Sequence, residues 1–145
     1  IQINEAKEVI PMIDIQYTIE TEQYGNKTGN RLFIPANIFR KGFTTPDLKQ
    51  RVQDIHINYG YLDTDSICLQ IPEGYTIESL PKTCQVTSSF GSFSSSLMIK
   101  DKEICIIHRL LMHRGIYPKE IYKDFLEFRK QIAAQYSSKI ILKKE

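Results

Sequence analysis

The sequence predicts a mainly-β protein: an antiparallel, sandwich-like β-sheet with one long C-terminal α-helix packed on it before a final strand. Three observations carry this prediction. Apolar and polar residues alternate in several short segments, which is the period of a half-buried strand. Turn-forming residues recur roughly every 8–12 residues, a spacing typical of antiparallel sandwiches and sheets. Helical spacing of apolar residues is convincing in one stretch, residues 117–136.

Length, composition and charge exclude several classes of protein. The chain has 145 residues, enough for one domain with a buried core, and its 41% hydrophobic and 25% charged residues are ordinary for a soluble globular protein. A net charge of +2, with basic and acidic residues interleaved, gives no argument for a nucleic-acid partner. No apolar run approaches the roughly 20 residues of a membrane span. We divide the chain into an entering segment or linker, residues 1–12, and a single β-rich domain, residues 13–145.

The first part of the domain predicts a β-hairpin. In residues 13–19, isoleucines and a tyrosine alternate with polar residues, as in a half-buried strand. The Gly and Asn residues of 24–30 predict a turn because they tolerate positive φ, and residues 31–34 form a short apolar strand that Pro35 ends. We therefore expect residues 13–19 and 31–34 to pair. Residues 36–51 are expected to be a long irregular connection.

The middle of the chain predicts a series of antiparallel strands. The segments with alternating apolar residues are 53–61, 67–71, 75–80, 83–90, 93–100 and 103–113. Turns are expected at 63–65, 72–74, 91–92 and 101–102. The Ser-rich stretch 87–96 also carries Phe90 and Phe93, so we expect it to form strands with one solvated Ser/Thr face.

The predicted helix, residues 117–136, has one strongly apolar face that must pack on another element, most simply the sheet. The residues expected on that face are Ile121, Tyr122, Phe125, Phe128, Ile132, Ala133 and Tyr136. Pro118 suits a first helical position, where a missing N–H costs nothing. Residues 138–143 then predict a final strand.

The three cysteines, Cys68, Cys84 and Cys105, are separated by whole predicted strands. No CxxC or Cys/His cluster indicates a zinc site. We expect three half-buried thiols that act as small apolar side chains. At most one internal disulfide could form, and we expect none on which the fold depends.

The histidines and carboxylates give no catalytic arrangement. His56 falls at the polar phase of its strand and is expected to be exposed, whereas His108 and His113 point to opposite faces of theirs. Cys105 and His108 also lie on opposite faces, so the thiol–imidazole pair left open is Cys84 or Cys68 with a histidine across the sheet. The Asp63 and Asp65 carboxylates are expected to be solvated in a turn, and Gly-rich phosphate loops are absent from the sequence. The sequence therefore predicts no catalytic, cofactor-binding or metal-ligating residue, and no enzyme.

Aromatic residues give the richer signal, with 8 Tyr and 7 Phe but no Trp. Tyr59, Tyr61 and Tyr75 are the candidates for an exposed binding surface. The competing interpretation is that they are core or half-buried sheet residues, which is the commoner place for such side chains.

Three motifs occur in a fixed order along the chain. LQIPEGY at 69–75 is followed by Leu80-Pro81, FGSF at 90–93 precedes a strand, and RGIYP at 114–118 precedes the aromatic residues of the helix. In this order and spacing the chain resembles the C-terminal domain of uncharacterised function that follows the transglutaminase-like core in exported Bacteroidetes proteins. The resemblance covers residues 13–143 and is best from Ile55 onward.

The resemblance implies a non-catalytic accessory domain that stabilises or positions the transglutaminase-like core, because that core's Cys, His and Asp motifs have no counterpart here. It implies the transglutaminase-like domain of the same parent chain as partner, and a location in the periplasm or at the cell surface. Since the sequence starts at Ile1 without an initiator Met or signal-peptide pattern, we expect a fragment of a longer protein. Two alternatives stay open: a glycan- or peptide-binding β-sandwich module that uses an aromatic sheet face, and a stand-alone cysteine hydrolase. Ligand and oligomeric state are left undefined.

Overall fold

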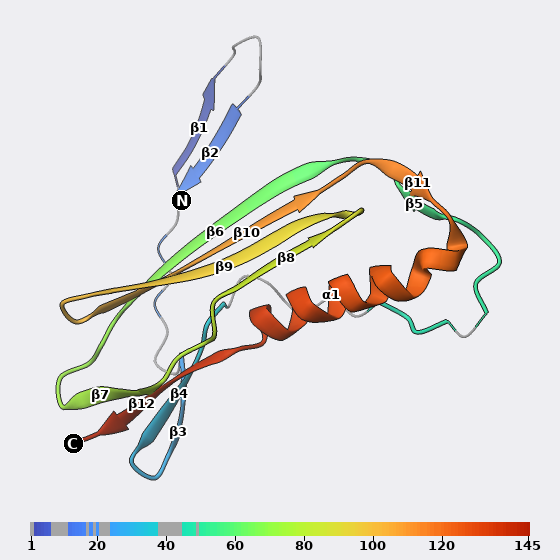
Figure 1. The fold of residues 1–145 in the computed structure, drawn as a ribbon. Coiled ribbons are helices and arrows are strands. Elements are labelled where there is room, and N and C mark those ends of the chain that lie inside the picture. Colours follow the sequence, from blue (N-terminus) through green and yellow to red (C-terminus); the bar gives the residue numbers. More distant parts are fainter. Residues whose placement is uncertain are drawn as a thin grey trace.

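The computed structural model describes residues 2–6, 12–16, 18, 20, 24–37, 45–48 and 50–145. In chain order the elements are β1 (Gln2–Ala6), β2 (Met12–Gln16), β3 (Asn26–Thr28), β4 (Arg31–Pro35), β5 (Ile55–Ile57), β6 (Tyr61–Gln70), β7 (Tyr75–Ser79), β8 (Cys84–Ser88), β9 (Gly91–Lys100), β10 (Glu103–Met112), β11 (Gly115–Tyr117), the 3₁₀ turn η1 (Lys119–Ile121), α1 (Tyr122–Tyr136) and β12 (Lys139–Lys144). The predicted fold class is confirmed: antiparallel sheets, one C-terminal helix and a final strand (Figure 1). No helix among the described residues is long and apolar enough to cross a membrane.

The central sheet has the strand order β6-β10-β9-β8. β10 pairs with β6 and with β9 over its full length, from Glu103 to Met112. Side chains alternate between the two faces of a strand, so Ile104, Ile106, His108, Leu110 and Met112 share one face and are all buried. The residues between them lie on the other face and are half-buried or exposed. We call these the inner and the outer face of the central sheet.

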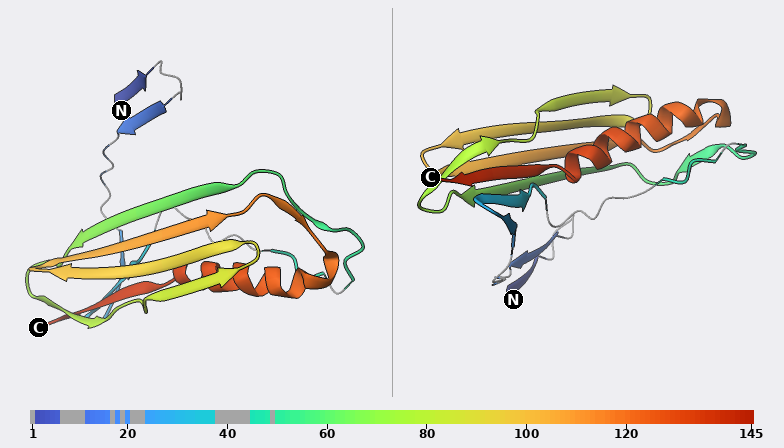
Figure 2. Two further views of the ribbon diagram at one scale, coloured as in Figure 1. Left: turned by 45° about the horizontal axis from the view of Figure 1, so that its top comes forward. Right: turned by 90° about the horizontal axis from the view of Figure 1, so that it is seen from below.

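Two different elements cover the inner face (Figure 2). Near the β8–β9 turn, α1 packs on the sheet, where Phe93 and Leu110 belong to its core cluster. Toward the β9–β10 turn, the second sheet packs Ile140 of β12 against Ile104 and Ile106. The fold is thus a two-layer sandwich in which the second layer is part helix and part sheet.

The helix packs through the face that its sequence predicts. Four of the expected residues are buried: Tyr122, Phe128, Ile132 and Tyr136. Leu126, which the sequence does not predict on this face, is buried with them. The remaining three expected residues, Ile121, Phe125 and Ala133, are half-buried. The Pro118 position precedes a 3₁₀ turn at Lys119–Ile121, and the α-helix itself starts at Tyr122.

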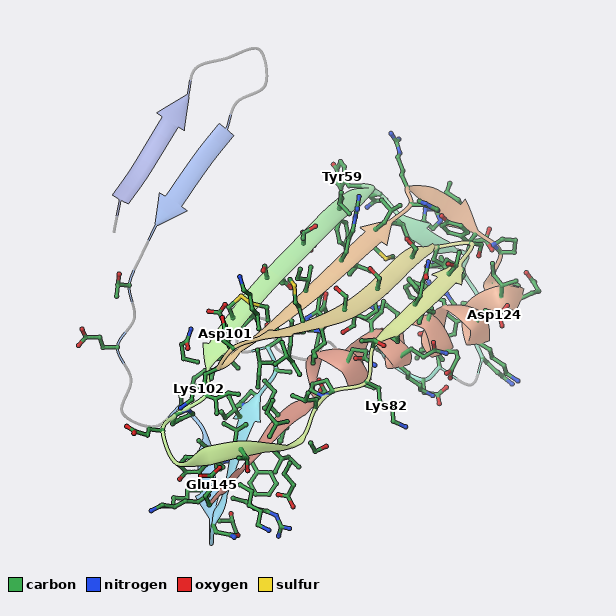
Figure 3. All side chains as sticks on the ribbon, turned by 60° about the vertical axis from the view of Figure 1, so that its left-hand side comes forward. Tyr59, Lys82, Asp101, Lys102, Asp124 and Glu145 are labelled. Carbon is green, nitrogen blue, oxygen red and sulfur yellow. A yellow bond between two sulfur atoms is a disulfide. The ribbon has the colours of Figure 1, made fainter. Side chains whose placement is uncertain are left out.

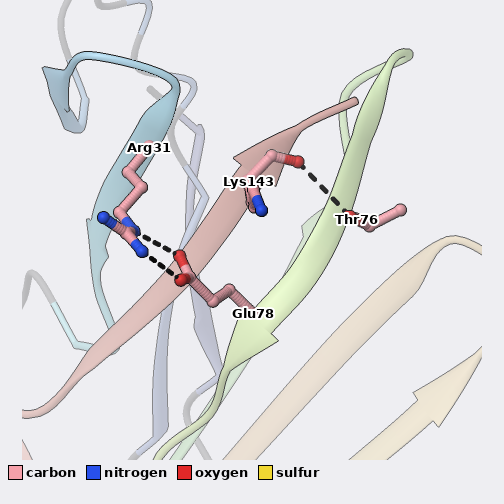
Figure 4. Close-up of polar contacts among 4 residues, drawn as sticks. All are labelled: Arg31, Thr76, Glu78 and Lys143. Carbon is pink, nitrogen blue, oxygen red and sulfur yellow. Dashed lines mark hydrogen bonds and ion pairs between the residues drawn. The ribbon is translucent and has the colours of Figure 1, made fainter.

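The second sheet has the strand order β3-β4-β12-β7. Arg31 on β4 reaches Glu78 on β7 across the intervening strand, with nitrogen–oxygen distances of 2.7 and 2.6 Å (Figure 4). The hydrogen bond from Arg31 lowers the pKa of the Glu78 carboxyl below its usual range. The ion pair is exposed, so it contributes little to stability.

The predicted hairpin between 13–19 and 31–34 is wrong. β2 pairs with β1, inside the segment expected to be a linker, and β4 pairs with β3 and β12. A two-residue turn at Gly29 and Asn30, with Gly29 at φ 59°, joins β3 to β4 directly. Such a local turn fixes its own hairpin and leaves no need for the longer loop. Tyr17 and Ile19 lie outside the described residues, as do 38–44 and 49 of the expected irregular connection.

Two of the predicted turns are also displaced. Residues 63–65 lie inside β6, where they pair with β10, and the chain instead breaks at 58–60, between β5 and β6. The turn expected at 91–92 lies at Ser89 and Phe90, because Gly91 already pairs with Met112. Gly91 has φ 148°, and a Cβ there would lie 1.9 Å from the Leu111 carbonyl oxygen. The glycine is therefore needed for close strand approach. The turns at 72–74 and 101–102 are confirmed.

The expectation of three separate thiols is wrong. Cys68 and Cys105 form a disulfide across β6 and β10, with a Cα–Cα distance of 4.1 Å, and Cys84 is free. The two residues are directly opposite in the register and on the outer face. Pairing of strands that lie 37 positions apart is a long-range property, which the spacing of cysteines along the chain does not show.

Candidate functional site

An open cleft of about 420 Å³ lies at the end of the molecule formed by β5 and β11. Its lining includes His56, Asn58, Tyr59, Arg114 and Ile116. β5 leads into β6 and β11 follows β10, so the two short strands continue the β6–β10 pair beyond the central sheet (Figure 1). His56 and Ile116 are directly opposite in this ribbon.

Two glycines beside the cleft, Gly60 and Gly115, lie in close contact with other parts of the chain. A Cβ on Gly60 would lie 3.1 Å from the Met112 carbonyl oxygen and 3.2 Å from the Arg114 nitrogen. A Cβ on Gly115 would lie 2.9 to 3.0 Å from atoms of the Tyr117 ring. A side chain at position 60 would therefore crowd the backbone of Met112 and Arg114, whereas one at position 115 would require the Tyr117 ring to shift.

The cleft offers hydrogen-bond donors and one fixed positive charge. Within the part of the chain that the structure describes, the side chains of His56, Asn58, Tyr59 and Arg114 make no hydrogen bond or ion pair. Arg114 presents a planar set of N–H donors that suits a carboxylate, and the Tyr59 ring, 81% exposed, offers a flat apolar surface. The arrangement can hold a small carboxylate-bearing group.

The three candidate tyrosines do not form one surface. Tyr59 lines the cleft, and Tyr61 opens β6 at the same end, close to the Arg129 side chain of the helix. Tyr75 opens β7 and is half-buried in the core cluster of the second sheet, beside Leu69 at the far end of β6. The ten residues of β6 span roughly 30 Å. Binding by any of the three stays a prediction, and the cleft involves Tyr59 alone.

Exposed apolar side chains gather at the cleft end of the molecule. Leu62 and Leu111 are directly opposite each other on the outer face, and both are exposed. Tyr59 and Ile116 are exposed in the adjoining cleft. We call these four residues the apolar end; Figure 3 shows it at Tyr59, opposite the turn that carries Asp101 and Lys102.

A row of polar residues crosses the inner face of the central sheet. Asp65 on β6, His108 on β10, Ser95 on β9 and Cys84 on β8 are neighbours in the register. The expectation that Asp65 is solvated in a turn is wrong: it is half-buried in β6, where Asn37 Nδ2 donates to its Oδ2 at 3.3 Å. The Asn37 amide nitrogen is also 3.4 Å from His108 Nδ1.

His108 is closed off from solvent. The side chain is 1% exposed and lies between the rings of Phe93 and Tyr136, at centroid distances of 5.8 and 5.3 Å. Burial lowers the pKa of the imidazole, against the nearby Asp65 carboxylate, which raises it. His108 Nε2 has no hydrogen-bond partner among the described residues. The side chain is therefore inaccessible to a substrate in this structure.

The thiols offer no catalytic pair with an imidazole in this geometry. Cys68 is bonded to Cys105 on the outer face, whereas His108 faces inward. Cys105 and His108 therefore lie on opposite faces of β10, as the sequence predicts. Cys84 faces inward but is two strands from His108, about 10 Å across the sheet, with Ser95 between them. Burial raises the pKa of the Cys84 thiol, although a backbone hydrogen bond with Ser95 opposes this, so the thiolate is disfavoured.

These features define a class: a small helix-covered β-sandwich domain with a closed inner face, an open outer face and a cleft at one end. The chain belongs to a family described as a domain of unknown function with a solved structure (DUF3858), whose family model matches residues 30–142. No curated protein and no solved structure matches the chain.

Part of the site was within reach of sequence reasoning. The sequence predicts Tyr59 as an aromatic candidate for binding, and His56 is exposed as its strand phase predicts. The sequence places Arg114 and Ile116 only in a motif, because the pairing of Ile116 with His56 joins residues 60 positions apart, which no local pattern shows. The RGIYP motif is the signal, since its residues Gly115–Tyr117 form the strand that pairs with β5.

Proposed function

We propose that this chain is a non-catalytic accessory domain of an exported transglutaminase-like protein, and that it docks against the transglutaminase-like domain of the same parent chain through the apolar end. The observation that carries the proposal is the exposure of Leu62, Leu111 and Ile116 together at one end of the molecule. Exposed apolar side chains that gather in one place favour a protein interface over a solvated surface. The partner and the parent chain come from the sequence resemblance.

Two further observations support the proposal. The buried His108 and the isolated Cys84 supply no accessible nucleophile–base pair, which favours a role without chemistry of its own. The Cys68–Cys105 disulfide suits an oxidising compartment, in agreement with a periplasmic or cell-surface location.

The test is a pair of aspartate substitutions, Leu62→Asp with Leu111→Asp, made in the parent protein and in the isolated domain. In the parent protein we expect a lower thermal midpoint of the transglutaminase-like domain, because two charges would be buried in the interface. In the isolated domain both positions are open, so we expect a smaller loss of about 1 kcal/mol, which comes from the repulsion of two like charges directly opposite each other.

Ser66→Asp is the matched control, since Ser66 is also exposed on the outer face of β6 but away from the apolar end. Equal effects of the control and the double variant, or no effect of either in the parent protein, would remove the docking role. Deleting residues 13–145 should lower the stability of the transglutaminase-like domain as well.

The cleft favours a second candidate, a binding module for a carboxylate-bearing peptide or glycan. Arg114 would bind the carboxylate and Tyr59 would stack on the flat part of the ligand. Arrays of acidic peptides and of uronate-containing glycans, probed in parallel, separate the two ligand classes. Loss of binding in both Arg114→Ala and Tyr59→Ala, but not in Lys119→Ala, would favour this candidate.

A further inference from the structure

The end of the outer face opposite the apolar end carries three sulfur atoms and a carboxylate. Cys105 on β10 is directly opposite Cys68 on β6 and, on its other side, directly opposite Met98 on β9. Glu103 lies two residues before Cys105 on the same strand and therefore shares its face. We call these four residues the sulfur cluster.

The carboxylate of the cluster is held toward the sulfur atoms. One oxygen of Glu103, Oε1, accepts a hydrogen bond from Gln70 Nε2 at 3.0 Å. The other oxygen, Oε2, is 3.7 Å from Cys105 Sγ. The ligand atoms of Cys68, Glu103 and Cys105 all lie within 4.8 Å of one another. An amide that orients one carboxylate oxygen and leaves the second toward two sulfurs is the arrangement that surrounds many metal ligands.

The cluster is open to solvent. Cys68 is exposed, Cys105 is half-buried and Met98 is 58% exposed. Exposed disulfides are the ones that thiols reduce most readily. The β6–β10 pairing extends on both sides of the cysteines, from Glu103–Gln70 to Met112–Tyr61. The strands therefore keep the two sulfur atoms adjacent after the bond between them is broken.

We propose that reduction of the Cys68–Cys105 disulfide turns the sulfur cluster into a binding site for a soft metal ion, Cu(I) in preference to Zn(II). The reductant is a dithiol. One of its thiolates attacks a sulfur of the disulfide and forms a mixed disulfide, which its second thiol resolves. Two electrons and two protons pass to the domain, leaving two thiols, and the dithiol becomes a disulfide. Metal binding then displaces both thiol protons.

The donor set decides the class of ion. Two thiolates and a thioether are soft ligands, which favour Cu(I), and a carboxylate can complete the site for Zn(II). Directly opposite residues on paired strands have Cβ atoms about 4.5–5.5 Å apart, and two thiolates on one tetrahedral ion are about 4 Å apart. Rotation of the cysteine side chains about χ1 can bring the two sulfur atoms to this separation without a change in the backbone. Oxidised, the same cluster offers neither thiolate, so the disulfide keeps the site closed.

The site does not depend on the docking function, because the sulfur cluster and the apolar end are at opposite ends of β6. Leu62 and Cys68 are six positions apart on β6, which is about 20 Å along a strand. A partner at the apolar end leaves the cluster accessible.

The experiment compares the oxidised and the phosphine-reduced protein in competition with bicinchoninate for Cu(I), under anaerobic conditions. We expect the reduced protein to remove one equivalent of Cu(I) from the chelator and the oxidised protein to remove none. Far-UV circular dichroism of the reduced protein checks that the sheet is intact. A reduced protein that binds no more Cu(I) than the oxidised one, or that loses the sheet signal, would overturn the proposal.

Variants that keep both cysteines test the remaining ligands. Met98→Leu should weaken Cu(I) binding at least tenfold and leave Zn(II) binding unchanged, whereas Glu103→Gln should weaken Zn(II) binding by about 10–100-fold. Cys84→Ser is the matched control and should change neither, because Cys84 lies on the inner face. Equal loss in Cys84→Ser, or unchanged Cu(I) binding in Met98→Leu, contradicts the assigned site.

Discussion

The two faces of the central sheet are made by alternate residues of the same strands, yet they have opposite properties. On β10, Ile106, His108 and Leu110 are nearly excluded from water, whereas Arg109 and Leu111, which each follow one of these residues, are exposed on the other face. The inner face holds the core and an enclosed histidine. The outer face holds the disulfide, the sulfur cluster and the apolar end.

The comparison teaches that burial, and not residue type, separates structure from candidate function in this domain. His108 has the chemistry of a catalytic residue but is enclosed by Phe93 and Tyr136. Met98 and Leu111 have the chemistry of core residues but lie in solvent. We therefore expect substitutions on the inner face to change stability, and substitutions on the outer face to change binding.

The largest expected effect is on the inner face. Phe128 is 2% exposed, and Phe128→Ala should destabilise the domain by about 3–5 kcal/mol because it leaves a cavity under the helix. Phe125→Ala should cost less, since Phe125 is half-buried; its ring makes a T-shaped contact with Phe90. Leu111→Ala on the outer face should cost about 0.5 kcal/mol or less. Urea denaturation of the three variants measures the differences; equal values for Phe128 and Leu111 would remove the distinction between the faces.

The next effect concerns the covalent link on the outer face. Opening Cys68–Cys105 should lower the free energy of unfolding by about 2–4 kcal/mol, because the unfolded chain is released from a long closed loop. We still expect the reduced domain to fold, since the ladder between β6 and β10 does not need the bond. Denaturation with and without phosphine measures the loss, and Cys84→Ser is the control. Complete unfolding on reduction would show that the fold does depend on the disulfide.

A smaller effect is a pH dependence from the inner face. The folded pKa of His108 lies below its ordinary value of 6.5, chiefly because of burial. The unfolded state therefore binds the proton more readily, and stability should fall as the pH drops from about 6.5 toward the folded pKa, then level off. His108→Gln should remove this slope, while His56→Gln, at an exposed position, should keep it. A slope that survives in His108→Gln would assign the titration to another group.

The smallest effect is expected from the exposed pair in the second sheet. Glu78→Gln removes the ion pair with Arg31, and we expect little change in the thermal midpoint at neutral pH. Because Arg31 lowers the folded pKa of Glu78, the contribution of the pair is present above the ordinary pKa of 4.5 and is lost as the pH falls through the folded value. Thermal melts at low and high salt would test it; a large, salt-independent loss would contradict an exposed pair.

The sequence by itself determined the elements whose cause is local. The two-residue period of 103–113 and the helical period of 117–136 report which side chains share a face, and both were predicted because burial of one face requires that period. The turn at 101–102 also has a local cause, because its residues favour the backbone conformation that a tight turn needs.

Only the tertiary structure decided which elements meet. The pairing of β6 with β10 joined Cys68 to Cys105 and placed Asp65 beside His108, and the pairing of β5 with β11 made the cleft. It also decided which face of the sheet the helix covers, which leaves Leu62, Met98 and Leu111 in solvent. These are contacts between residues far apart in the chain, and their free energy depends on packing across strands, which periodicity along one strand does not record.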